Sequence, residues 1–371
     1  MLLCVGCGGV GKTTTCAALG LAAARSGKRV LCLTIDPARR LAESLGLERF
    51  KTEAQRIDAE VFAAADVEVE GSLTVMMLDT KGTFDSLVTA LAATPEKRQR
   101  VLDNPLYQYI SSSLAGTQEY MAMEKLYSVK DDPSYDLILL DTPPTSHALD
   151  FLDAPERLAS AIDSAAVRWL LQATARTGKF SLNLLARTAA SVLRGLGRIT
   201  GGGFLDQVAG FLAEMNELFG SWKSRTEEVA SALRRPDVAY VLVTSPDPLS
   251  IREVLFFADR LREQGMQPDA YVINRVHAPI SDIPDAHAVV QAAHRHGLEM
   301  SGSLAERVIE AMKQEARLGE LDRLHLIAIE EAFDEGLASP PVVRVPDFPL
   351  DIHDVRRLIW VANTLAPATV P

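Results

Sequence analysis

The sequence predicts an α/β protein with a mostly parallel sheet that is flanked by helices. Three observations support this. Short runs rich in Val, Ile and Leu alternate with longer amphipathic stretches, which is the pattern of strands joined by crossover helices. These runs are apolar almost throughout, as expected for strands covered on both faces. A purely helical pattern between residues 151 and 235 predicts an inserted all-helical subdomain.

The expected strands are separated by stretches long enough for a helix. They cover residues 2–5, 29–35, 73–79, 135–141, 238–244, 270–275 and 342–345. The stretches 283–296 and 303–336 carry apolar residues at broadly helical spacing and predict two further helices. Residues 1–150 and 236–371 would then form one α/β domain, and residues 151–235 would interrupt it.

Composition narrows the class of protein. The chain has 371 residues, of which 47% are hydrophobic, and this is enough for a sizeable core. A net charge of −11 argues against nucleic acid as a partner, because phosphate backbones are held by basic surfaces. No apolar run approaches the roughly 20 residues of a spanning helix, and residues 1–5 are used as a strand instead of a signal peptide. We therefore expect a cytoplasmic location, either free or peripheral at a membrane.

A glycine-rich motif follows the first strand. Residues 6–13, Gly-Cys-Gly-Gly-Val-Gly-Lys-Thr, match the phosphate-binding pattern G-x-x-x-x-G-K-[ST] between an apolar run and a helix-like stretch. Glycines let successive backbone N–H groups converge on phosphate oxygens, and the following helix adds its positive end. Lys12 would contact the β- and γ-phosphates, and the Thr13 hydroxyl would hold Mg²⁺. The expected nucleotide contacts are Gly8, Gly9, Val10, Gly11, Lys12, Thr13 and Thr14.

Two aspartates end other predicted strands, at the sheet edge where ligands of such folds bind. Asp36 could orient the attacking water and contact hydrated Mg²⁺, which makes it, with Lys12, a candidate catalytic residue. An ordinary Asp-Pro turn is the alternative interpretation of Asp36. Asp141 is the candidate Mg²⁺-side carboxylate, so the expected metal group is Thr13, Asp36 and Asp141.

The glycine-rich motif resembles the deviant loop K-G-G-x-G-K-T-T of the P-loop NTPase class that includes ArsA and the guided-entry ATPases. Gly8, Gly9 and Thr14 carry that resemblance. It implies ATP and Mg²⁺ as cofactors, ATP hydrolysis and a dimer. In that class the first lysine crosses to the partner's nucleotide, whereas this chain has Cys7, which is uncharged and too short. The resemblance therefore implies a loop competent within its own chain, deficient toward a partner and low in intrinsic turnover.

Two further segments resemble the nucleotide switches of these ATPases. The run Asp36-Pro37-Ala38 is similar to the D-P-A-H-N segment, although Arg39-Arg40 replaces His-Asn. The run from residue 141 to 147 is similar to the D-T-A-P-T-G-H segment, which passes the nucleotide state to a helical subdomain. The switch residues that this resemblance implies are Pro37, Thr142, Pro143, Pro144 and His147.

The base-binding residues are expected from two later segments. Asn274-Arg275 closes a predicted strand and aligns with the asparagine that reads adenine in ArsA-type ATPases. A side-chain amide can donate to and accept from an adenine edge at the same time. Residues 345–349, which include Pro346 and Asp347, resemble the loop on the other side of the base. Ordinary turns at strand ends remain the alternative for both segments.

All four cysteines lie in the first 32 residues. Cys4 and Cys7 spell C-x-x-C, but the pair spans a strand end and a phosphate loop, which disfavours a redox or zinc pair. We interpret Cys4, Cys16 and Cys32 as small buried apolar residues. The Cys7 thiol, beside phosphate-binding amides, would be open to ionisation or oxidation.

The helical segment leaves the partner open. Residues 161–200 carry six basic side chains and one acid, which suits a membrane surface, a hydrophobic client or an acidic partner. A plain packed subdomain is an equal alternative. The lack of cysteine after Cys32 excludes a thiolate arsenite site there.

Similar bacterial ATPases occur as pairs in which one subunit lacks the lysine, so homodimer and heterodimer with a paralogue both stay open. The first hypothesis is an ATPase switch, and the second is a regulatory ATP-binding subunit of a heterodimer with negligible turnover.

Overall fold

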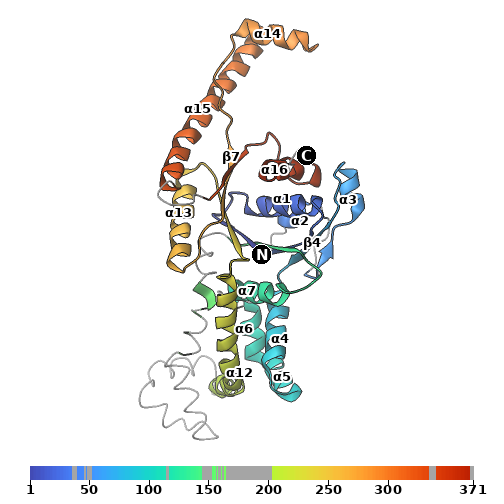
Figure 1. Cartoon of the computed structure of the whole chain (residues 1–371), viewed down its shortest axis with the longest axis vertical. Helices are drawn as coiled ribbons and strands as arrows, with labels where there is room; N and C mark the ends of the chain where they lie inside the picture. Colours follow the sequence, from blue (N-terminus) through green and yellow to red (C-terminus); the bar gives the residue numbers. More distant parts are fainter. Residues whose placement is uncertain are drawn as a thin grey trace. The chain divides into compact units, whose positions relative to one another are not determined.

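The computed structural model describes residues 1–35, 40–45, 47, 52–113, 117–143, 153–155, 157, 160, 163, 203–333 and 340–367. The chain divides into two compact units, whose elements are labelled in Figure 1. Unit 1 comprises Met1–Met77, Pro133–Ser146 and Asp237–Pro371, and unit 2 comprises Leu78–Asp132 and His147–Pro236.

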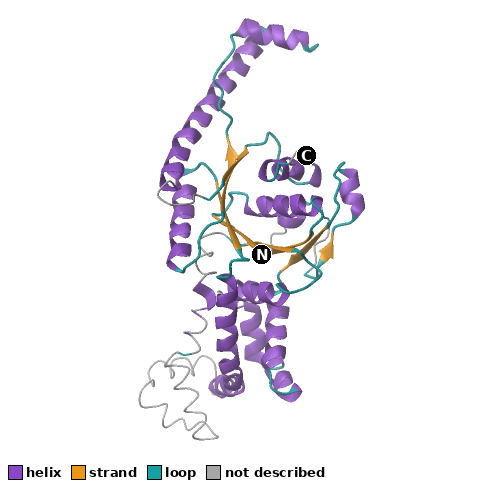
Figure 2. Cartoon of the chain, in the orientation of Figure 1, coloured by secondary structure: helices purple, strands orange, loops and turns teal. Residues whose placement is uncertain are grey.

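Unit 1 is built on an eight-stranded sheet, drawn in orange in Figure 2, with the order β3-β4-β2-β5-β1-β6-β7-β8. Neighbouring strands pair in parallel except β3 and β4, which are antiparallel. The predicted mostly parallel sheet is therefore confirmed. The strands are β1 (Leu2–Gly6), β2 (Arg29–Thr34), β3 (Gln55–Arg56), β4 (Ser72–Met77), β5 (Leu137–Asp141), β6 (Ala239–Thr244), β7 (Ala270–Val276) and β8 (Val342–Pro346).

Helices flank this sheet. The described helices of unit 1 are α1 (Lys12–Arg25), α2 (Arg40–Ser44), α3 (Ala59–Ala64), α13 (Pro248–Glu263), α14 (Ala286–Arg295), α15 (Gly302–Phe333) and α16 (Val355–Leu365). Helix α1 packs against α16 and β2, α13 packs against β6, and α14 packs along α15. Aspartates fix three helix starts, since Asp247, Asp285 and Asp354 each accept a hydrogen bond from a backbone N–H three residues later.

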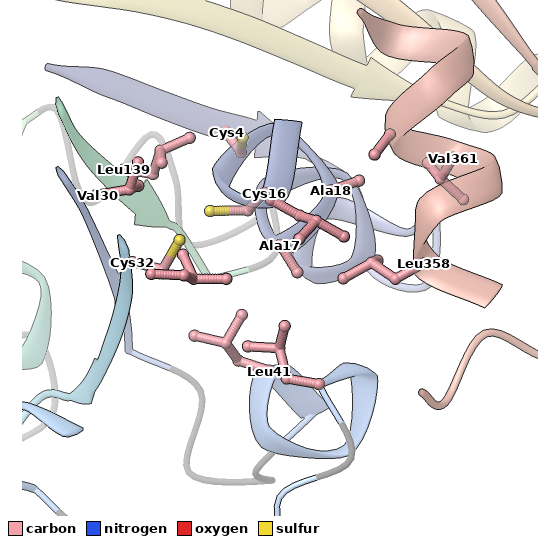
Figure 3. Packing of buried hydrophobic residues seen from close by; sticks show 14 of the residues in the cluster. Cys4, Cys16, Ala17, Ala18, Val30, Cys32, Leu41, Leu139, Leu358 and Val361 are labelled. Atoms are coloured by element: carbon pink, nitrogen blue, oxygen red, sulfur yellow. The ribbon is translucent and has the colours of Figure 1, made fainter. Parts of the chain in front are cut away.

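The core of unit 1 lies between the central strands and the pair α1 and α16 (Figure 3). Cys4, Cys16 and Cys32 are each 0% exposed and carry free thiols, which confirms their interpretation as small buried residues. A hydrogen bond with Cys16 and burial raise the pKa of the Cys32 thiol well above its usual range, so it stays protonated at neutral pH. These thiols act as apolar packing groups.

Unit 2 is helical in the part that the structure describes. Its long helices are α4 (Thr80–Leu91), α5 (Pro95–Leu102), α6 (Pro105–Ser113), α7 (Thr117–Val129) and α12 (Gly203–Leu233). Helix α12 packs against each of the other four. Phe84 contacts Tyr107 and Trp222 edge-on, with ring centroids 5.9 Å and 5.4 Å apart, and these pairs form an aromatic core.

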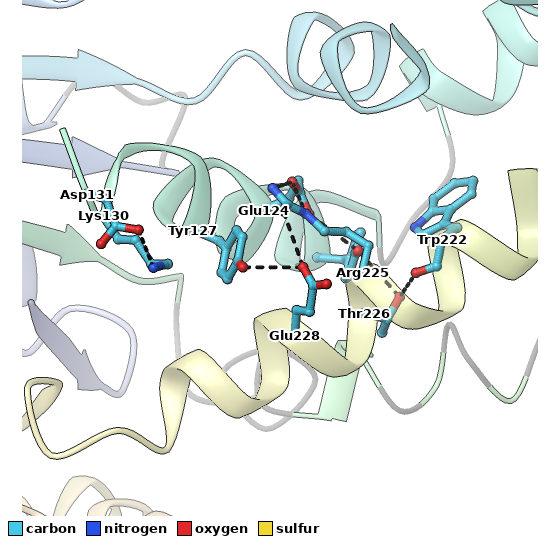
Figure 4. A network of polar contacts seen from close by, with 9 residues as sticks. Glu124, Tyr127, Lys130, Asp131, Trp222, Arg225, Thr226 and Glu228 are labelled. Atoms are coloured by element: carbon cyan, nitrogen blue, oxygen red, sulfur yellow. Dashed lines mark hydrogen bonds and ion pairs between the residues drawn. The ribbon is translucent and has the colours of Figure 1, made fainter. Parts of the chain in front are cut away.

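A polar network also joins α7 to α12 (Figure 4). Glu124, which is buried, accepts hydrogen bonds from Nε and Nη2 of Arg225 at 2.9 Å and 2.7 Å. The Arg225 guanidinium lies 4.0 Å from the centroid of the Tyr127 ring, and the Tyr127 hydroxyl donates to Glu228 at 3.3 Å. Loss of Arg225 would leave the buried Glu124 carboxylate without its cation, so this network stabilises the packing of α7 against α12.

The subdomain expected at residues 151–235 lies largely outside the described residues. Of that segment, the structure describes α12 and the short pieces 153–155, 157, 160 and 163. Among the helices it does describe, none combines the length and the apolar character needed to cross a bilayer.

Candidate nucleotide-binding site

The glycine-rich motif forms a tight loop between the end of β1 and the start of α1. Gly9 and Gly11 have φ of 81° and 94°, in the left-handed region that favours glycine. The Gly11 carbonyl accepts the first helical hydrogen bond, from the Thr15 N–H at 2.9 Å. The loop therefore leads directly into a helix N-terminus, whose unpaired N–H groups and positive dipole favour a bound anion.

The motif lysine lies along this loop. Lys12 is 7% exposed, and its Nζ donates to the Cys7 carbonyl at 2.7 Å. Its positive charge is thus held beside the loop amides, where the predicted phosphate contact requires it.

Two hydroxyl groups converge on one carboxylate oxygen beside the loop. Thr13 Oγ1 donates to Asp141 Oδ2 at 2.8 Å, and Thr34 Oγ1 donates to the same oxygen at 3.0 Å. The cause is strand order, because β5 lies between β1 and β2, so the ends of all three strands meet here. The structure therefore brings together Thr13 and Asp141, as the sequence predicts.

Sequence reasoning missed Thr34. It is 0% exposed, and its register partner on β5 is Asp141 itself. The available signal was a polar residue at the end of an otherwise apolar strand, two positions before Asp36. Such a residue can only be assigned a partner once the neighbouring strand is known.

The side-chain oxygens of Thr13 and Asp141 are of the kind that binds Mg²⁺. Hydroxyl and carboxylate oxygens are hard ligands, and Mg²⁺ in nucleotide sites takes one or two protein ligands beside water and phosphate. Over the residues that the structure describes, no cluster of three or more His, Cys, Asp or Glu side chains could hold a metal ion. The Thr13 hydroxyl and the Asp141 carboxylate are therefore the candidate protein ligands of Mg²⁺.

The predicted switch residues are described only in part. Thr142 follows Asp141 and is 3% exposed, and its hydroxyl donates to the Cys4 carbonyl at 2.8 Å, which ties the start of the segment to β1. Pro143 is the last described residue of this stretch. The other predicted switch residues, Pro37, Pro144 and His147, lie outside the described residues, and so does the candidate catalytic residue Asp36.

A cavity of about 480 Å³ adjoins the loop on its β7 side. Its lining includes the predicted residues Gly11, Thr14, Asn274, Arg275, Pro346 and Asp347. Phe348 of the expected segment 345–349 also lines it, and sequence reasoning missed the remaining lining residues, which are Ser44, Leu350, Asp351, Ile352, His353 and Val361. The segments around residues 274 and 346 meet because β7 and β8 are neighbours. The cavity is large enough for a nucleoside, and its walls combine apolar faces with carboxylate, amide and guanidinium groups.

Comparison with known families supplies the decisive observation. The family model described as anion-transporting ATPase matches residues 1–295, which include the loop, both hydroxyl donors and Asp141. The chain belongs to the anion-transporting ATPase family. Membership in this family, which includes ArsA and Get3, supports ATP hydrolysis, and its members bind ATP with Mg²⁺ and typically form dimers.

Three relatives to which the chain is similar are fungal ATPases. The chain is 29% identical over 276 residues to ATPase get3 of Aspergillus terreus, covering 74% of this chain and 72% of the relative. It is 28% identical over 279 residues to ATPase GET3 of Paracoccidioides lutzii, covering 75% and 73% of the two chains. ATPase get3 of Aspergillus niger is 27% identical over 276 residues, with coverage of 74% and 72%.

The loop of this ATPase family member has one further contact. Cys7 is 5% exposed, and its Sγ donates to the Ser250 carbonyl at 3.5 Å. Ser250 lies in the first turn of α13. The side chain at this position therefore packs within its own subunit.

Proposed function

We propose that the chain is an ATP-binding, Mg²⁺-dependent ATPase whose nucleotide state controls a helical subdomain. The observation that carries this proposal is the convergence of Thr13 and Thr34 on Asp141 beside the phosphate loop. Thr13 and Asp141 would hold Mg²⁺, which when bound would neutralise charge that develops during phosphoryl transfer. The residues of the chain would hold that ion through oxygen atoms and orient the phosphates through Lys12 and the loop amides.

On the phosphate side, the proposed contacts are the residues from Gly8 to Thr14. The N-terminus of α1 supplies the N–H groups of its first turn, and Lys12 supplies the only side-chain charge of the motif. Asp36 is proposed as the residue that positions the attacking water and completes the metal group with Thr13 and Asp141.

On the base side, adenine is proposed to occupy the cavity beside the loop. Asn274 and Asp347 offer an amide and a carboxylate that can pair with the amino edge of a purine. Arg275 and Pro346 would line the same side of the ligand.

The switch proposal rests on chain connectivity and on the resemblance to ArsA and the guided-entry ATPases. Asp141 and Thr142 end β5, and the chain then passes from unit 1 into unit 2 after Ser146. A carboxylate that holds Mg²⁺ at the start of this segment can bias its conformation, and the segment includes Pro143, Pro144 and His147. We propose that residues 151–235 form the helical subdomain that responds, as a surface for a hydrophobic client or a membrane.

Cys7 favours a second function within the same class. An uncharged side chain that bonds to Ser250 in its own subunit supplies no cation to a partner's nucleotide. The alternative is therefore a regulatory ATP-binding subunit with low turnover, paired with a paralogue that carries the lysine. A homodimer would lack this charge on both sides.

Steady-state ATP hydrolysis by the purified chain, alone and with a lysine-bearing paralogue, separates these functions. Lys12→Ala and Asp36→Asn are the matched inactive controls. Turnover by the chain alone that both variants abolish would support the self-sufficient ATPase. No turnover alone, with tight ATP binding and activity restored by the paralogue, would support the regulatory subunit. A chain that neither binds nor hydrolyses ATP under any of these conditions would contradict both.

A further inference from the structure

Strand β7 is irregular next to the phosphate loop. Its pairing with β8 runs from Ile273 opposite Arg344 to Val276 opposite Pro346, so β7 contains one more residue than β8 over this stretch. This is a β-bulge at Asn274 and Arg275. Arg275 has φ of 60°, a left-handed conformation that is uncommon for a residue other than glycine. Bulges re-aim side chains, and here the residue that is re-aimed is Asn274.

The bulge directs Asn274 onto the phosphate loop. The Nδ2 of Asn274 donates to the Val10 carbonyl at 2.8 Å, across 264 residues of sequence. The amide also lies directly over Gly11, because a Cβ built on Gly11 would be 2.2 Å from Asn274 Nδ2. Gly11 therefore has two reasons to be glycine, its left-handed backbone and the space that Asn274 occupies.

This contact fixes the orientation of one peptide group of the loop. The Val10 carbonyl and the Gly11 N–H belong to the same planar trans peptide, so they point in opposite directions. A carbonyl held toward Asn274 keeps the Gly11 N–H turned away from β7. The same contact prevents the carbonyl oxygen from rotating toward a bound anion, where it would repel phosphate.

We infer that Asn274 is a positioning residue of the phosphate loop and acts on the phosphates independently of the base. This inference rests on the proposed function, because it concerns how the loop holds the phosphates of ATP. One Nδ2 hydrogen is used by Val10, and the amide is thereby held in one orientation. Any contact with the base is then made by an amide whose direction the loop has set.

The two possible roles of Asn274, binding the base and positioning the loop, predict different effects on ligand affinity. A residue that only reads the base contributes to ATP affinity, contributes less to GTP affinity and contributes nothing to inorganic tripolyphosphate. A residue that orients the Gly11 peptide contributes to all three ligands by a similar factor.

The test is isothermal titration calorimetry of the full-length chain with Mg²⁺ and each of ATP, GTP and tripolyphosphate. We expect Asn274→Ala to weaken all three by about five- to tenfold, the strength of one hydrogen bond, with the ratio of ATP to GTP affinity changed less than about twofold. Asn274→Leu keeps the side-chain volume but removes the hydrogen-bond donor, and we expect it to weaken binding by the same factor as Asn274→Ala. It replaces the alanine variant in the test if that variant does not fold. Asn363→Ala is the matched control, because it removes a surface amide that pairs with Arg25.

Three outcomes would overturn the inference. Loss of ATP affinity with tripolyphosphate affinity unchanged would make Asn274 a base reader only. No change for any ligand in a folded variant would make the Val10 contact irrelevant to binding. A wild-type chain that binds neither ATP nor tripolyphosphate would overturn the proposed function as well, which distinguishes that failure from the other two.

Discussion

The two halves of the candidate site are held in different ways. In the phosphate half, Thr34 and Asp141 end two adjacent strands and are at most 1% exposed, and Thr13 in the first turn of α1 donates to Asp141. The base half, formed by Asn274, Arg275, Pro346 and Asp347, borders a cavity of about 480 Å³. The first half is preorganised by contacts inside the sheet, and the second leaves space for the ligand. Chemistry at the phosphates should therefore tolerate little change, while the base half should be more permissive.

The largest expected effect is in the phosphate half. Asp141→Asn replaces the metal-side carboxylate by an amide, which is a poor Mg²⁺ ligand, so we expect Mg²⁺-dependent ATP turnover to fall about 100-fold. The measurement is hydrolysis rate as a function of Mg²⁺ concentration. Asp347→Asn is the matched change in the base half and should lower turnover much less. Equal losses in the two variants would remove the distinction between the halves.

Gly11 lies where the two halves meet, and its substitution should have the next largest effect. Gly11→Ala forces an alanine to φ of 94° and against Asn274, and strain of about 1–2 kcal/mol with that clash should weaken ATP binding about 10- to 30-fold. Gly265→Ala is the control, since it has φ of 76° and nothing within 4 Å of the added Cβ. We expect the control to lose stability only. ATP titration and thermal unfolding of both variants separate binding from strain, and unchanged ATP affinity in Gly11→Ala would contradict the close contact.

Thr34 should have a smaller and more specific effect. Thr34→Val keeps the shape of the side chain but removes the hydroxyl that donates a hydrogen bond to Asp141. The Mg²⁺ concentration for half-maximal turnover should therefore rise about fivefold. Thr34→Ser should restore it, which a purely structural role would not require. Thr244→Val is the matched control, because Thr244 ends β6 and donates to Ser245 instead. If both valine variants shift the Mg²⁺ dependence equally, Thr34 has no special relation to the metal side.

The smallest expected effect is a pH dependence of stability, which arises at His277 just after β7. Burial alone would lower the pKa of His277, but a hydrogen bond and the charge of Asp322, with Glu315 and Asp347 nearby, raise it above its usual value. A raised folded-state pKa means that the stabilisation is present below about pH 6.5 and is lost as the pH rises through the folded-state value.

The contribution should be below about 1 kcal/mol, since the pair is partly solvated. The thermal midpoint of the wild type should fall between pH 6 and 8 as this stabilisation is lost, and His277→Ala should reduce that fall. His287→Ala, on the exposed face of α14, is the control and should leave the fall unchanged. An unchanged pH profile in His277→Ala would show that the ion pair with Asp322 contributes nothing measurable.

The sequence predicted the strands well for a physical reason. Buried parallel strands require continuous apolar runs, and each expected run corresponds to a strand of the sheet within two residues at either end. It missed β3, because Gln55–Arg56 is a two-residue polar strand at the sheet edge with no apolar pattern. The proximity of Thr13 and Asp141 was also predictable, since Asp141 ends one strand, Thr13 follows another, and the carboxyl ends of parallel strands share one edge.

Other features depend on contacts between distant parts of the chain. The bulge at Asn274 and Arg275 has no sequence signal, because arginine is not typical of a left-handed conformation. The packing of α4 to α7 with α12 is held by pairs such as Glu124 and Arg225, which are 101 residues apart.

We propose that this single chain builds the metal-binding part of an ATP site from Thr13 and Asp141. The most direct measurement is equilibrium binding of ATP to the purified chain, with and without Mg²⁺, for the wild type and Thr13→Ala. We expect Mg²⁺ to strengthen ATP binding to the wild type by at least about tenfold and to give little gain to Thr13→Ala. A full Mg²⁺-dependent gain in Thr13→Ala, or no ATP binding by the wild type, would contradict it.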